Sequence, residues 1–170
     1  IVRDICDFQV EEDGVDYQAD ALRLNDIREG QDYQGVRVRL NAIIGGARVP
    51  LQIDVGFGDA VTPSAVEMTY PTLLGYPAPV VRTYPRETVI AEKLHAMVEL
   101  GMANSRMKDF YDIYSLAQSH TFHGAPLCAA IKATFNRRST PFPKGIPIAL
   151  STEFSRDTFK TAQWRAFVTG

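Results

Sequence analysis

Two residues, Asp54 and Lys93, have types and surroundings that suit contact with a metal ion or a phosphate group. Asp54 lies among alternating apolar residues, so a strand there turns its carboxylate to the other face, and Gly56 and Gly58 leave room beside it for a ligand. Lys93 borders an apolar helical stripe, where its amine is placed to meet phosphate oxygens. Two simpler interpretations stay open, namely a solvated aspartate on the outer face of a sheet and a lysine whose amine reaches water.

Asp109 and Asp112 form a second candidate group, because residues three apart on a helix face the same way. Like charges at that spacing cost roughly a few tenths of a kcal/mol unless a cation lies between them, and Arg106 and Lys108 are placed to supply it. Asp109 can also be explained as a cap of free N–H groups at the start of its helix, so Asp112 is the more informative residue. His95 has no second ligand at metal-binding spacing, and we expect it to be a surface histidine.

The strands that would carry Asp54 are predicted within residues 15–60. The segments GVRVRLNAII (35–44) and ARVPLQIDVGF (47–57) alternate apolar and polar residues with the period of two that a half-buried strand requires. Gly45-Gly46 between them tolerates the positive φ angles of a tight turn. We therefore expect these two segments to pair antiparallel.

The helices that would carry the other candidates are predicted after residue 84. Residues 61–84 contain four prolines, which favours a structured loop or short strands. A helix begins after Pro85 and ends at Gly101, and a second one over 105–118 packs antiparallel to it because the link is short. Two more helices are expected, over 126–138 and 155–168. The apolar stripes of the first two helices comprise Ile90, Leu94, Met97 and Val98, and Phe110, Ile113, Tyr114 and Ala117.

Length and composition favour one domain, and the order of the predicted elements makes it an α+β domain, with a sheet region over 1–84 and a helical region over 85–170 packed on it. The chain has 170 residues, 45% of them hydrophobic, which suffices for a core. Cys6 and Cys128 lack metal-binding spacing, so we expect reduced, buried cysteines and a cytoplasmic location. No apolar run approaches the roughly 18 residues of a membrane span, so no membrane partner is expected.

Charge limits the class of partner. The net charge of −2 and the pI of about 5.9 argue against binding of nucleic acid through bulk charge. Two local basic clusters remain as candidate surfaces. They comprise Lys132, Arg137, Arg138 and Lys144 in one group and Arg82 and Arg86 in the other.

Three segments together resemble the AbiEii/AbiGii toxin family. They are RVPLQIDVGFGDAVTP (48–63), YPRETVIAEKLHAM (84–97) and ANSRMKDFYDIYSLA (103–117), and the likeness runs over most of the chain. The most specific feature is the ordered series of a strand aspartate, an EKL helix and a KDxYD helix. The resemblance implies a DNA polymerase β-like nucleotidyltransferase fold and a toxin of a bacterial toxin–antitoxin or abortive-infection pair.

The resemblance also implies roles for the candidate residues. Asp54 matches the third carboxylate of the metal site, and Lys93 matches the lysine that contacts nucleotide phosphates, with Arg106 and Lys108 as further nucleotide-binding cations. The implied catalytic residues are Asp54, Lys93, Asp109 and Asp112. The implied cofactor is Mg²⁺ or Mn²⁺ with an NTP as substrate, because phosphoryl transfer uses metal ions and cations to neutralise charge on phosphate oxygens. The implied partners are a cognate antitoxin and an acceptor, with tRNA or a protein as candidates.

One departure from the family stands out. The Gly-rich turn and Asp-x-Asp strand of the family are not found before Asp54, and Asp13 to Asp20 do not supply them. We therefore expect the middle and later part of a longer protein, with the N-terminal part of the domain missing and the fragment alone inactive. The alternatives are a catalytically silent module that binds antitoxin or RNA through its helical face, and a plain structural domain.

Overall fold

The computed structural model describes residues 1–10, 12–28 and 34–170, which fall into two compact units, Ile1–Asp59 and Ala60–Gly170. Each unit is described by itself. Residues after Asp59 join the helical unit through Thr62, whose N–H donates to Thr88 Oγ1 at 3.0 Å and whose carbonyl accepts from the same hydroxyl at 2.8 Å. The division into domains at residue 84 stays a prediction.

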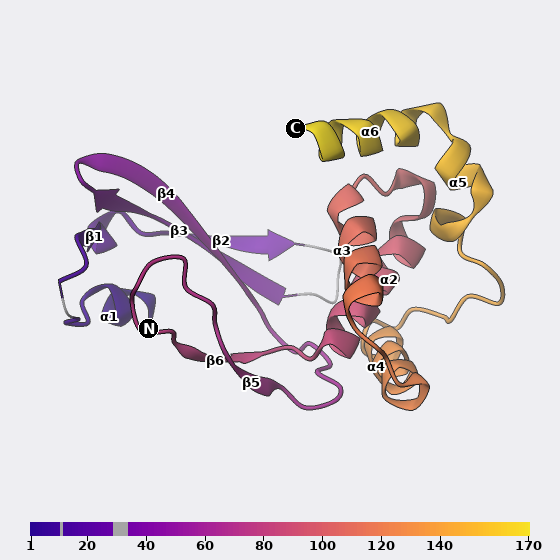
Figure 1. The fold of residues 1–170 in the computed structure, drawn as a ribbon, viewed down its shortest axis with the longest axis horizontal. Coiled ribbons are helices and arrows are strands. Elements are labelled where there is room, and N and C mark those ends of the chain that lie inside the picture. The colour runs from indigo at the N-terminus through magenta and orange to yellow at the C-terminus, as the bar shows by residue number, and fades with distance from the viewer. Residues whose placement is uncertain (11, 29–33) are drawn as a thin grey trace. The chain divides into compact units, whose positions relative to one another are not determined.

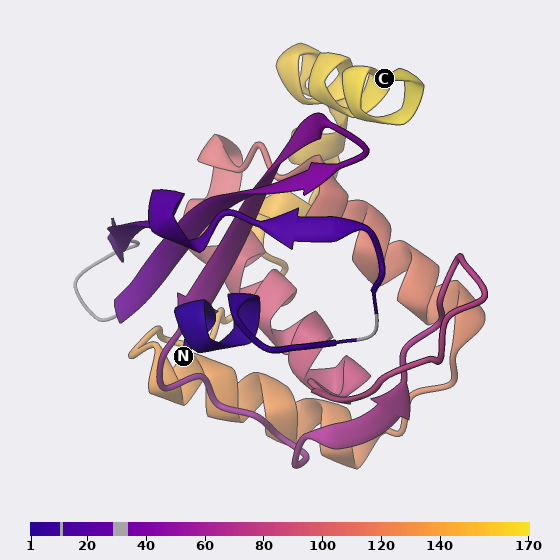
Figure 2. The same cartoon turned by 90° about the vertical axis from the view of Figure 1, so that its left-hand side faces the viewer.

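The first unit is an antiparallel sheet with the longest strand, β3, in the middle (Figure 1). β1 and β2 pair with successive parts of one edge of β3, and β4 pairs with its other edge. Gly45 and Gly46 form the turn between β3 and β4, with φ angles of 56° and 83°, so the predicted hairpin is confirmed (Figure 2). The elements are α1 (Val2–Cys6), β1 (Val15–Tyr17), a 3-10 turn (Ala19–Ala21), β2 (Arg23–Arg28), β3 (Gln34–Ile44) and β4 (Ala47–Gly56).

The alternation of residues along β3 separates two faces of the sheet. Val38, Leu40 and Ala42 are buried on one face. Arg37 and Arg39 project from the other face, which they share with their cross-strand partners on β4. Asp54, the partner of Arg37, therefore lies on the polar face, as the period of two predicted.

The second unit begins with a β-hairpin and continues as helices. Its core contains Met97, Met107, Ala149 and Phe154, against which Phe110 and Ile113 pack. Short strands, one of the two alternatives expected within 61–84, and the end of α2 before Gly101 are as predicted. The elements are β5 (Val66–Thr69), β6 (Val80–Thr83), α2 (Arg86–Leu100), a 3-10 turn (Gly101–Ala103), α3 (Met107–Ser119), α4 (Gly124–Arg137), a 3-10 turn (Ile148–Leu150), α5 (Thr152–Arg156) and α6 (Thr158–Thr169).

Two details of the second unit differ from expectation. The C-terminal helix is broken at Asp157, whose Oδ1 accepts from Lys160 N at 2.9 Å and so caps the start of α6. The apolar stripe of α3 is narrower than predicted, because Tyr114 is 63% exposed and Ala117 is exposed.

Within the described chain, no helix is long and apolar enough to cross a bilayer.

The cysteines are free, as expected, but they are not buried. Cys6 is half-buried at the end of the short helix α1, and Cys128 is exposed on α4. Cysteine behaves as a small hydrophobe in many cores, and that general preference misled the prediction because neither helix turns its cysteine inward.

Candidate functional site

Lys93 of α2 lies between two carboxylates of α3. Its Nζ is 2.7 Å from Asp109 Oδ1 and 2.8 Å from Asp112 Oδ2. The spacing of three along α3 turns both carboxylates to one side, towards α2. Asp109 is 5% exposed and Lys93 is 16% exposed, so the interpretation of Lys93 as a lysine that reaches water is wrong.

Two further cations complete this cluster. Arg106 Nε lies 2.7 Å from Asp109 Oδ2, a buried oxygen that accepts no hydrogen bond from the described residues. Lys108 Nζ lies 2.6 Å from Asp112 Oδ2, one turn away on α3. The expectation that Arg106 and Lys108 offset the repulsion between the carboxylates is confirmed. We call these five residues the Lys93 cluster, and with three cations and two carboxylates it carries a formal charge of +1.

The environment keeps the charged forms in place. Burial acts to lower the pKa of Lys93, but the hydrogen bonds to Asp109 and Asp112 outweigh it and raise that pKa above its usual 10.5. Burial acts to raise the pKa of Asp112, but hydrogen bonds from Lys108 and Lys93 hold it below its usual 3.8. At neutral pH, both Lys93 and Asp112 are therefore ionised.

An open depression of about 490 Å³ adjoins the Lys93 cluster at the N-terminus of α3. Arg106, Lys108 and Asp109 form its polar wall, and α6 supplies the opposite wall. The lining residues are Ser105, Arg106, Met107, Lys108, Asp109, Gln163, Ala166 and Phe167. The two cations expected to bind nucleotide therefore border one concave surface, although Lys93 itself is not among the residues that line it.

Asp54 is held by its neighbour on β3 rather than exposed alone. Arg37 donates from Nε to Oδ1 and from its terminal NH2 to Oδ2, both at 2.8 Å, and Gln52 Nε2 donates to Oδ2 at 3.4 Å. The hydrogen bonds from Arg37 hold the pKa of Asp54 below its usual 3.8. The sequence contained the signal for this pair, because a turn at Gly45 and Gly46 sets the register that places Arg37 opposite Asp54.

The structure brings Lys93, Asp109 and Asp112 together, whereas Asp54 belongs to the other compact unit. The meeting of Asp54 with Lys93 in one pocket therefore stays a prediction. Among the described residues, no group of three or more His, Cys, Asp or Glu could hold a metal ion. Asp54, Asp109 and Asp112 are each paired with a cation of the protein, so a metal ion at any of them would compete with an ion pair.

His95 and Arg138 have roles that the sequence did not reveal. His95 is half-buried, with its ring edge against Phe135 and its Nε2 2.7 Å from Thr140 Oγ1, so the expectation of a surface histidine is wrong. Arg138, a member of the predicted basic cluster, donates to Glu92 Oε2 at 2.9 Å and so joins α4 to α2. Both contacts depend on how α4 and the segment after it pack on α2, which helical periodicity does not specify.

Comparison with known proteins gave one match. The model of the family described as nucleotidyl transferase AbiEii toxin, type IV TA system, matches residues 1–170. No curated protein and no solved structure matched the chain significantly.

Proposed function

Because the chain belongs to the family of AbiEii nucleotidyl transferase toxins of type IV toxin–antitoxin systems, we propose that the complete protein transfers a nucleotide from an NTP to an RNA acceptor. The observation that carries this proposal is the Lys93 cluster, in which a mostly buried ammonium is fixed by two carboxylates beside two more cations. A cognate antitoxin is the partner that the family suggests.

The Lys93 cluster suits the charge changes of nucleotidyl transfer. A hydroxyl of the acceptor forms a bond to the α-phosphorus while the bond from that phosphorus to the bridging oxygen breaks, and pyrophosphate leaves with added negative charge. An ammonium has three N–H donors, and Lys93 gives two to Asp109 and Asp112, which leaves one for a phosphate oxygen. A cation already held in place stabilises developing charge without reorganising.

We assign Arg106 and Lys108 to the phosphates as well, because both line the depression at the start of α3. Mg²⁺ or Mn²⁺ would neutralise negative charge on the phosphates in such a reaction. Asp54 is the residue that we propose as one ligand of that metal, and the chemistry assigned to the Lys93 cluster is limited to binding and orienting phosphate.

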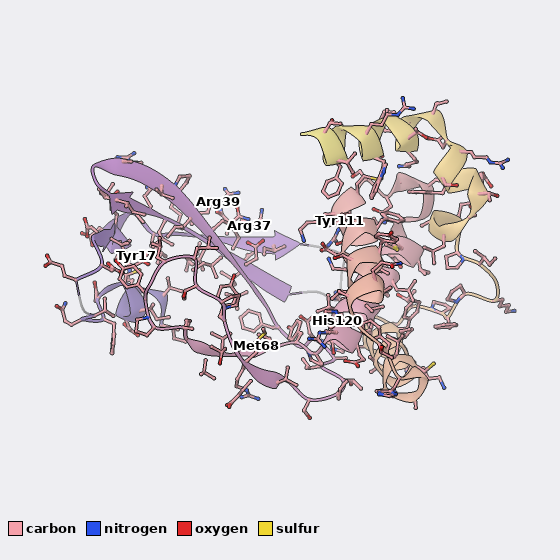
Figure 3. The ribbon with its side chains drawn as sticks, viewed as in Figure 1. Tyr17, Arg37, Arg39, Met68, Tyr111 and His120 are labelled. Carbon is pink, nitrogen blue, oxygen red and sulfur yellow. The ribbon has the colours of Figure 1, made fainter. Side chains whose placement is uncertain are left out.

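The polar face of the sheet supports RNA as the acceptor. Arg23 on β2 is the cross-strand partner of Arg39 on β3, and like charges directly opposite each other destabilise a sheet. Gln52 completes that row from β4, so the row contains no carboxylate. Figure 3 shows Arg37 and Arg39 along β3. The same face favours a second candidate function, an RNA-binding module without catalysis, since phosphates would relieve the repulsion between arginines in either case.

The test is transfer of labelled nucleotide by the complete gene product in the presence of Mg²⁺, an RNA pool and each NTP in turn. We expect Lys93→Met to lower the rate of incorporation by about a hundredfold or more, the range measured for loss of one fixed donor to a developing charge. Arg138→Met is the matched control, because it also removes an ion pair of α2, with partners that are each 23% exposed.

Arg138→Met is expected to retain most of the transfer activity in the folded protein. Equal losses in the two variants would mean that the Lys93 cluster only holds helices together, and unchanged activity in Lys93→Met would refute the assignment. RNA binding without incorporation by the unmutated protein would favour the silent module.

A further inference from the structure

Lys160 is a buried cation that the proposed transfer reaction does not use. It lies on the first turn of α6 and is 6% exposed. Its Nζ donates to Asn104 O at 2.7 Å and to Gln163 Oε1 at 3.3 Å, and it lies 5.3 Å from the centroid of the Phe154 ring. Within the described chain, no carboxylate lies at ion-pair distance from this amine.

Lys160 lines a pocket of about 460 Å³ whose walls are mainly apolar. Three helices supply aromatic side chains to it, namely Phe110 from α3, Phe154 from α5 and Trp164 from α6. The volume falls in the range of small-molecule sites, which are apolar clefts with a few polar groups that fix orientation. Met107 is the residue that this pocket shares with the depression beside the Lys93 cluster, so the two concave surfaces are distinct.

The electrostatics of Lys160 define the chemistry of a ligand. A buried ammonium without a counter-charge is costly, and the partners of Lys160 are two neutral oxygens and the rings of Phe154 and Phe159. Two of its three N–H groups are used, which leaves one donor for a ligand. An anionic oxygen is the acceptor that gains most from such a donor, because charge-assisted hydrogen bonds are about twice as strong as neutral ones.

We propose that this pocket binds a small organic anion with a flat apolar body. The body lies among Phe110, Phe154 and Trp164, and the anionic group accepts a hydrogen bond from Lys160. Carboxylates, sulfonates and phosphates of aromatic compounds belong to this class. The site is separate from the Lys93 cluster and does not depend on the function proposed for that cluster.

The single tryptophan of the chain, Trp164, lines the pocket and serves as a built-in reporter. The probes are 1-anilinonaphthalene-8-sulfonate and the uncharged N-phenyl-1-naphthylamine, which has the same ring body without the sulfonate. We expect saturable quenching of Trp164 with one sulfonate probe bound per chain, and an affinity for it at least about tenfold above that for the neutral probe.

Two variants distinguish the contribution of the Lys160 charge to binding from that of the apolar pocket. Lys160→Met should remove the preference for the sulfonate and leave binding of the neutral probe. Ser155→Phe places a bulky ring in the lining while Lys160 is retained, and it should weaken both probes about tenfold or more. Lys132→Met, an exposed lysine on α4, is the control and should bind both probes as the unmutated chain does. Near-UV circular dichroism checks that each variant is folded.

Equal affinity for the two probes would overturn the proposal and would mark the pocket as an apolar contact surface for another protein. Unchanged binding of the sulfonate in Lys160→Met would overturn it too. Should Lys160→Met not fold, Ser155→Phe decides, because sulfonate binding that survives that substitution would place the probe elsewhere.

Discussion

Lys93 and Asp109 depend on each other, because they form an ion pair in which both side chains are largely shielded from water. Removing one partner of such a pair leaves the other charge buried, which costs far more than removing both. We expect Lys93→Met to lower the free energy of unfolding by about 2 to 3 kcal/mol, somewhat less than for a fully buried pair since Arg106 still faces Asp109. Urea denaturation measures it.

A double-mutant cycle sharpens that prediction. Lys93→Met combined with Asp109→Asn should recover more than half of the lost stability, because no uncompensated charge then stays in the interior. Additive losses in the double variant would contradict the strong coupling between the two residues.

We expect the folded protein to lose stability in mild acid, because His95 becomes protonated there. Burial first, and then the positive charge of Arg138, hold the pKa of His95 below its usual 6.5. The Thr140 hydroxyl donates to Arg138 O and so accepts from Nε2 of a neutral imidazole. The unfolded chain therefore binds a proton at a higher pH than the folded chain does, and the stability due to neutral His95 is complete above pH 6.5 and lost as the pH falls towards the lowered pKa.

Urea midpoints between pH 7.5 and pH 5 measure this loss. His95→Gln should flatten the decline, while His123→Gln, an exposed histidine before α4, should leave it unchanged. A decline of equal steepness in His95→Gln would assign the effect to other groups.

At the scale of elements, the turn after α2 depends on Gly101. Its φ of 49° with ψ of −128° is a combination that side chains disfavour, and an added Cβ would lie 3.1 Å from Ile148 Cγ2. We expect Gly101→Ala to lower the free energy of unfolding by at least about 1 kcal/mol. Gly145→Ala, where an added Cβ meets nothing within 4 Å, is the control for thermal or urea denaturation.

The arginine row on the sheet predicts salt-dependent binding of RNA. Arg39→Gln removes one exposed cation from the row, and it should weaken RNA binding and reduce the slope of log affinity against log salt by about 1. Lys132→Gln on α4 tests the helical face instead and should leave both quantities unchanged. The reverse pattern in a titration at several salt concentrations would place RNA on the helices.

The sequence patterns predicted helices and strands more accurately than they predicted contacts between side chains. The period of two in β3 and β4, the glycine turn, and the helix that ends at Gly101 are local features, and the structure has them. The break at Asp157 is local as well, but a C-terminal amphipathic pattern masks a single capping residue. The contacts of Lys93 were predicted only in part. The spacing of Asp109 and Asp112 predicts a cation between them, but it does not identify the residue of α2 that supplies it.

At the scale of the whole molecule, the two units have unequal cores. The buried apolar residues described in the first unit are Val38, Leu40 and Ala42, whereas the second unit has its own cluster around Met97 and Phe154. We expect residues 60–170 alone to keep helical circular dichroism and to unfold in one cooperative step, and residues 1–59 alone to lack a cooperative transition. A cooperative transition in residues 1–59 would contradict this.

Contacts between residues far apart in the sequence were the hardest feature to predict. Lys93 and Asp112 lie on α2 and α3, which are joined by a short link, so the packing of these two helices suffices to bring them together. Asp54 is tied by register to Arg37 on the adjacent strand, which periodicity also determines. Its predicted association with Lys93 depends on how separate units combine, for which no local pattern gives the rule.

Because Asp54 is paired with Arg37, a cation can bind the Asp54 carboxylate only by replacing Arg37. Both oxygens already accept from one guanidinium at 2.8 Å, and the guanidinium is tethered on the neighbouring strand. A cation that binds Asp54 must first displace the Arg37 guanidinium, which is always present beside the carboxylate. The apparent affinity of the cation is therefore the free energy of its own binding to Asp54 less that of the Arg37–Asp54 pair. Replacing Arg37 by glutamine should therefore tighten binding of any cation that Asp54 accepts.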